Sequence, residues 1–134
     1  SEQLDIAEGT ESNAHEVLDV AKGVEIYEID GPFFFGVATK FDEMMRTSMA
    51  NKPLVRIIRM RKVPFIDSTG IHNLEMLINS SQNEGIHVVL SGVKDNVRQV
   101  LHHANIDKLI GEDHICDHIT KAVVMANTIV ANSK

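Results

Sequence analysis

The segment LVRIIRMRKVPFIDSTGIHNLEMLI, residues 54–78, contains a strand pattern and a helix pattern in direct succession. Residues 54–60 are rich in Val and Ile, which favour strands. From Ile71 onward, large apolar side chains recur at the spacing of one helix face up to Gly85, a residue type that commonly ends a helix. The turn Asp67-Ser68-Thr69-Gly70 lies between the two patterns. This segment therefore predicts a strand, a turn and a helix.

The alternation of strands and helices extends in both directions from this segment. Enrichment in β-branched residues and the helical spacing of apolar side chains identify the further elements. Strands are predicted at residues 24–29 and 86–90, and helices at residues 36–50, 97–104 and 115–130. Because successive parallel strands need a crossover element between them, we predict an α/β fold with at least partly parallel strands.

Three consecutive phenylalanines, Phe33, Phe34 and Phe35, follow the turn signal Asp30-Gly31-Pro32. Aromatic residues make up only 4% of the chain, so this segment holds much of its aromatic bulk. Aromatic side chains bury large areas and dominate core energetics. We expect at least one of the three to anchor the core.

The composition is typical of one globular domain. The chain has 134 residues, 43% of them hydrophobic, and a chain of this length forms a core without disulfides or metals. Cys116 is the single cysteine, in agreement with a fold without disulfides. No segment approaches the roughly 20 uninterrupted apolar residues of a membrane span, so we expect a soluble, cytoplasmic chain. The excess of 19 acidic over 13 basic residues disfavours nucleic acid as a partner.

The first twenty residues differ in character from the rest. Five acidic residues and no lysine or arginine lie between Ser1 and Glu16, where large apolar side chains are few. Segments of this composition bury little surface. We therefore predict two parts, an acidic tether at residues 1–20 and a folded domain at residues 21–134.

The Asp67-Ser68-Thr69-Gly70 turn is the most informative segment for function, because ligands on open α/β sheets commonly bind at strand-to-helix loops. Asp67, Ser68 and Thr69 can each accept from the free N–H groups of the first helical turn. A phosphate on Ser68 or Thr69 would meet the same donors and the favourable end of the helix dipole. The residues leave two interpretations open: a helix cap alone, or a switch loop completed by Asp67 and Gly70.

A basic run stands out in this acidic chain, formed by Arg59, Arg61 and Lys62 together with Arg56. One interpretation is that these charges balance local acids at the end of a strand. The other is contact with an anionic lipid headgroup, a phosphate-bearing ligand or an acidic partner surface.

Metal and catalytic signatures are weak. His114 and His118 are spaced four residues apart and could contact one metal ion from a helix, but Cys116 would point away from them. No third ligand follows at a suitable spacing, so we predict a solvated helix edge and no metal site. The sequence contains no Walker loop, nucleophile elbow or zinc-binding His-Glu helix. We predict no enzymatic activity and no cofactor.

In the order of its motifs, the chain resembles the STAS domain, a module shared by anti-sigma factor antagonists and SulP-type sulfate and anion transporters. The Asp67 to Gly70 turn after a strand carries the first part of the resemblance. Other segments are closer to the transporter branch, namely YEIDGPFFFG at 27–36, RM at 59–60, VP at 63–64 and GIHVVLSGV at 85–93. The resemblance covers about residues 21–130, nearly the whole predicted domain.

This resemblance implies a non-enzymatic regulatory and protein-interaction domain with a STAS-like mixed β-sheet flanked by about four to five α-helices. The parent protein would be an anion transporter, with this domain on the cytoplasmic side of the inner membrane and residues 1–20 as linker. The implied partners are its transmembrane domain and a cytoplasmic regulatory protein or a nucleotide, and membrane contact would come only through the rest of the parent chain. The alternative is a free-standing anti-sigma factor antagonist, whose phosphorylated serine corresponds to Ser68.

Overall fold

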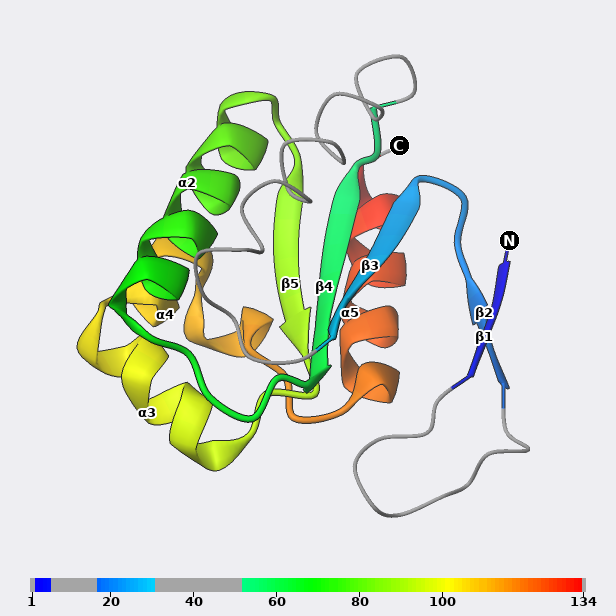
Figure 1. Ribbon diagram of the computed structural model, residues 1–134. Coiled ribbons are helices and arrows are strands. Elements are labelled where there is room, and N and C mark those ends of the chain that lie inside the picture. The colour runs from blue at the N-terminus through cyan, green and yellow to red at the C-terminus, as the bar shows by residue number, and fades with distance from the viewer. Residues whose placement is uncertain (1, 6–16, 31–51, 134) are drawn as a thin grey trace.

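A computed structural model describes residues 2–5, 17–30 and 52–133 (Figure 1). Its centre is a three-stranded sheet of β3 (Val24–Asp30), β4 (Val55–Lys62) and β5 (His87–Ser91), in that spatial order. All three strands are parallel, and the register places Ile57 between Ile26 and Val89. Helix α2 (Ser68–Asn83) supplies the crossover that parallel strands β4 and β5 require.

Helices cover both faces of this sheet. Helices α2, α3 (Asp95–His103) and α4 (Ile106–Ile110) lie on one face, and α5 (Ile119–Asn132) lies on the other (Figure 1). The short 3₁₀ helix η2 (Glu112–His114) follows α4. Residues 55–60 of the central strand β4 are all buried, because a strand between two helical layers packs on both faces. Ile58 and Met60 pack with Leu74 of α2, whereas Val55 and Ile57 pack with α5 residues.

A charged side chain lies in the buried part of β4. The Arg56 side chain is fully buried, and its Nε donates to Glu25 Oε1 of β3 at 2.8 Å. Its Nη1 donates to Ser81 Oγ of α2 at 2.6 Å. Because a buried charge is costly unless it is paired and hydrogen-bonded, these partners allow Arg56 to join β3, β4 and α2.

A separate antiparallel pair is formed by β1 (Glu2–Asp5) and β2 (Val17–Val20). Val20 is 1% exposed and belongs to the apolar cluster that includes α5. The tether predicted at residues 1–20 therefore contains regular structure, and its last residue lies in the core. The division between tether and domain at residue 20 stays a prediction.

The α/β fold predicted from the sequence is confirmed, with four helices flanking the parallel sheet in the described part of the chain. The strands predicted at 24–29, 54–60 and 86–90 are present as β3, β4 and β5, with shifted ends. The helix pattern from Ile71 corresponds to α2 and that at 97–104 to α3. The predicted helix at 36–50 and the core role of Phe33, Phe34 and Phe35 lie outside the described residues.

The prediction of one long final helix from residue 115 is wrong at its start. Helix α5 begins at Ile119, while Ile115 forms a parallel bridge to Leu90 of β5. The Cys116 N–H donates to the Leu90 carbonyl at 2.8 Å. Ile115 packs with the α2, α3 and α4 side of the core, whereas Ile119 packs on the opposite face. The four-residue spacing of these two residues is typical of one helix face, but their side chains pack on opposite faces of the sheet.

Candidate functional site

The turn predicted as a switch connects β4 to α2, and Asp67 caps the helix. Asp67 has an extended backbone and is the N-cap residue, and its Oδ1 accepts from the Gly70 N–H at 2.8 Å. The Ile71 N–H donates to the Asp67 carbonyl at 2.9 Å. The capping interpretation therefore holds for Asp67 itself. Gly70, whose N–H donates this hydrogen bond, is buried.

Ser68 and Thr69 begin α2 on its solvent side. Both residues are exposed, and their hydroxyls make no hydrogen bond to the described part of the chain. The first turn of α2 contains no acidic side chain, and the leading N–H groups of a helix lack intrahelical acceptors. This geometry leaves both hydroxyls accessible at the positive end of the helix dipole.

The loop before the cap is anchored to a neighbouring helix. Asn96 Nδ2 of α3 donates to the Pro64 carbonyl at 2.7 Å, and Ile66 is buried in the core. Between these two anchors, the Phe65 side chain is 51% exposed. A large apolar side chain thus lies on the surface within three residues of Ser68. Neither the Asn96 contact nor the exposure of Phe65 was predicted from the sequence. The Asn96 contact joins residues far apart in the chain.

Most side chains of the basic run form ion pairs with acidic residues of β3. Arg61 Nε and Nη2 donate to the two carboxylate oxygens of Glu28 at 2.8 and 3.3 Å, and Lys62 Nζ lies 3.8 Å from Glu28. Burial raises the pKa of Glu28, but the Arg61 hydrogen bond and the nearby positive charges outweigh it and hold that pKa below its usual value. These contacts agree with the interpretation that Arg61 and Lys62 balance the charge of nearby acidic residues at the end of a strand.

Arg59 occupies a different environment from the end of the run. Arg59 is buried, with 2% of its surface exposed. It is paired in register with Ser91 of β5. An anion or partner could reach Arg59 only after the structure around it rearranged. Of the three predicted contact residues, Arg61 and Lys62 are the ones that reach solvent.

The two spaced histidines do not share a helix. His114 lies in η2, and its Nδ1 is 3.0 Å from the Val88 carbonyl. His118 caps α5, and its Nδ1 accepts from the Thr120 N–H at 3.1 Å. The predicted solvated helix edge is therefore wrong, because each ring has a local structural partner. Within the described ranges, no three metal-ligating side chains lie close enough to hold an ion.

A family model described as the STAS domain matches residues 17–122, which include the sheet, the capped turn and most of the helices. The chain belongs to the STAS domain family. The order of motifs around the Asp67 to Gly70 turn suggested this family, and the match confirms that prediction.

Solved structures place this STAS domain with those of transporters. A sulfate transporter family protein from Wolinella succinogenes is 41% identical, with a TM-score of 0.81 over 85% of this chain and 93% of that one. The STAS domain of a SulP transporter from Vibrio cholerae is 36% identical, with a TM-score of 0.76 over 85% of this chain and 88% of that one. A proposed anti-sigma factor antagonist from Thermotoga maritima, 19% identical with a TM-score of 0.66, shares the fold alone.

Among curated proteins, Sulfate transporter 1.1 of Arabidopsis thaliana is 28% identical over 123 residues, which are 84% of this chain and 19% of that transporter. The chain spans less than a fifth of the length of the curated relatives it matches. No helix within the described residues is long and apolar enough to cross a membrane. The relatives are thus transporters in which this domain is one part.

Proposed function

We propose that this STAS domain is a non-enzymatic regulatory and protein-interaction module on the cytoplasmic side of a SulP-type anion transporter, with Asp67 to Gly70 as its switch. The observation that carries the proposal is the pair of exposed hydroxyls on Ser68 and Thr69, which form no hydrogen bond within the described residues and directly follow an intact helix cap. The kinship with sulfate transporter STAS domains supplies the context.

The local physics favours a charge switch at Ser68. A kinase would transfer a phosphoryl group from ATP to Ser68 Oγ, which adds about two negative charges and three acceptor oxygens. The free N–H groups and dipole of α2 stabilise those charges, while the Asp67 carboxylate repels them. These two effects are similar in size at an exposed site, so the fold persists in either state. A partner packed over the turn would have to desolvate the new charge, which is costly unless it is paired.

The exposed side chain of Phe65 gives the same surface an apolar anchor. The cores of protein interfaces are enriched in aromatic side chains, including Phe, and are surrounded by a polar rim. Phe65 is three residues from Ser68. We propose that a protein covers Phe65 and the turn together. The transmembrane domain of the parent transporter is the first partner to test, and a cytoplasmic regulatory protein or a nucleotide stays a prediction. The free-standing antagonist has less support, because its structural neighbour shares only the fold.

The test is anion transport by the full-length parent carrying Ser68→Glu or Ser68→Ala. We expect Ser68→Glu to change transport at unchanged protein abundance, and Ser68→Ala to abolish any response to kinase or phosphatase treatment. Asn79→Glu is the matched control, because Asn79 is exposed on the same helix but lies far from its first turn. Equal effects of Ser68→Glu and Asn79→Glu, or no effect of either Ser68 variant, would reject the switch.

A further inference from the structure

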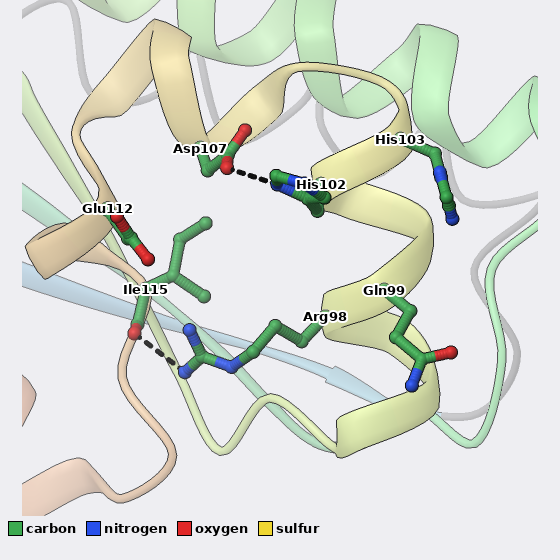
Figure 2. A pocket seen from close by; sticks show the side chains of 7 residues that line it. All are labelled: Arg98, Gln99, His102, His103, Asp107, Glu112 and Ile115. Carbon is green, nitrogen blue, oxygen red and sulfur yellow. Dashed lines mark hydrogen bonds and ion pairs between the residues drawn. The ribbon is translucent and has the colours of Figure 1, made fainter.

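A pocket of about 240 Å³ lies where α3, α4 and η2 meet, and none of its lining residues belongs to the turn at the start of α2 (Figure 2). Its base is formed by Ile115, which is buried. Charged side chains of both signs come to it from different elements, Arg98 from α3, Asp107 from α4 and Glu112 from η2. The pocket therefore combines an apolar base with opposite charges.

Arg98 offers hydrogen-bond donors that the described part of the chain does not use. Figure 2 shows its side chain extending from α3 toward Ile115, where Nη2 donates to the Ile115 carbonyl at 2.8 Å. No other acceptor in the described part of the chain takes the Nε or Nη1 hydrogens of this half-buried side chain. A guanidinium held in place with free N–H groups matches the geometry of a carboxylate or another oxyanion.

The two carboxylates of the pocket differ in the hydrogen bonds and ion pairs that they form. Asp107 Oδ2 lies 2.7 Å from His102 Nδ1, and its Oδ1 accepts from the Lys108 N–H at 3.0 Å. Glu112 is exposed and forms no ion pair within the described residues, including none with Arg98. The open carboxylate of Glu112 would attract an ammonium group and repel a plain anion. Arg98 and Glu112 together thus select a ligand that carries both charges.

The size of the pocket limits the ligand further. A volume of 240 Å³ corresponds to about eight water molecules at roughly 30 Å³ each, and lies below the range of about 300 to 1,000 Å³ typical of larger ligands. We propose that this pocket binds a small zwitterion of the α-amino acid class. Its carboxylate pairs with Arg98, its ammonium with Glu112, and a short apolar side chain packs on Ile115. This site is independent of the switch at Ser68.

The test is a titration of the ¹⁵N-labelled domain followed by NMR, with calorimetry for affinities. L-Leucine carries the carboxylate, the ammonium and the apolar side chain, whereas L-leucinamide lacks the carboxylate and 4-methylpentanoate lacks the ammonium. Sulfate is an oxyanion that can pair with Arg98 but lacks both the ammonium and the apolar side chain. We expect L-leucine to bind with a dissociation constant on the order of 1 mM. L-Leucinamide and 4-methylpentanoate should bind about tenfold more weakly or worse, because each loses one charged hydrogen bond. Shifts should be confined to residues 98–115.

Two variants with a control identify the site. Glu112→Gln should lower the affinity for L-leucine about tenfold without lowering that for 4-methylpentanoate. Glu112 is exposed, so this substitution should leave the fold intact. Arg98→Gln should lower the affinity for both ligands, while Glu75→Gln on α2 should leave both affinities unchanged. The proposal fails if L-leucine produces no shifts, if sulfate or 4-methylpentanoate binds as tightly as L-leucine, or if Glu112→Gln leaves the affinity for L-leucine unchanged.

Discussion

Arg56 in β4 and Ser68 at the start of α2 are close in sequence but occupy opposite environments. Arg56 is fully buried between Glu25 and Ser81, with nitrogen to oxygen distances of 2.8 and 2.6 Å. Ser68 is exposed, and its hydroxyl makes no hydrogen bond to the described chain. Burial obliges a polar group to find partners within the protein, whereas exposure leaves it available to other molecules. We therefore assign a stabilising role to the Arg56 cluster, whereas the regulatory role of the turn is the proposal to be tested.

The largest expected effect comes from Arg56→Ala. The substitution leaves the Glu25 carboxylate without its buried partner and should lower the free energy of unfolding by about 3 to 5 kcal/mol, measured by urea denaturation. Arg61→Ala is the control, because Arg61 also pairs with a β3 glutamate but is partly solvent-exposed. Exposed pairs contribute up to about 1 kcal/mol. Equal losses in the two variants would contradict the role assigned to burial.

A smaller loss is expected from Asp67→Ala, which removes the acceptor for the Gly70 N–H. Loss of an N-cap side chain typically costs about 1 kcal/mol. Asp67→Asn keeps an acceptor at the same position and should retain most of the stability. If urea midpoints show that Asp67→Ala matches the wild type, the cap is not a stabilising part of the turn and Ser68 could replace it.

The sequence predicted the turn well because its chemistry is local. An N-cap depends on residues within one helical turn, so a cap among Asp67, Ser68 and Thr69 could be predicted from their order alone. That order did not decide which of the three provides the cap. The basic run was ambiguous, because its partners Glu25 and Glu28 lie on another strand and face it only through the parallel register. Hydrophobic periodicity gives the direction of a side chain relative to its own element, but not the residue that lies opposite on the next.

The pocket was not predicted for a related reason. Helix α4 has five residues and η2 has three, too few to show a period, and Asn105 precedes α4 in a left-handed conformation with φ of 62°. The spacing of Ile115 and Ile119 then suggested a helix across a segment that bridges β5. Arg98 and Glu112 line the same pocket only because these short elements fold back toward α3.

The ion pairs of Glu28 give a modest dependence of stability on pH. The pKa of Glu28 is lowered in the folded state, where Arg61 and neighbouring positive charges outweigh burial. Its contribution to stability is therefore present above the unfolded pKa near 4.5 and is lost as the pH falls through the lower folded value. Melting temperatures from pH 7 to pH 3 should fall less steeply for Glu28→Gln than for the wild type. Parallel profiles would contradict the assignment of the Arg61 and Lys62 charges to Glu28.

The most direct measurement of the contrast between the buried cluster and the exposed turn is the urea denaturation of Ser68→Glu. The favourable helix dipole and the repulsion from Asp67 each amount to less than about 1 kcal/mol at an exposed site and oppose each other. The free energy of unfolding should therefore stay within about 0.5 kcal/mol of the wild type, as it should for Ser68→Ala. A loss for Ser68→Glu as large as that of Arg56→Ala would show that the turn is part of the packed structure, and would contradict its assignment as a surface switch.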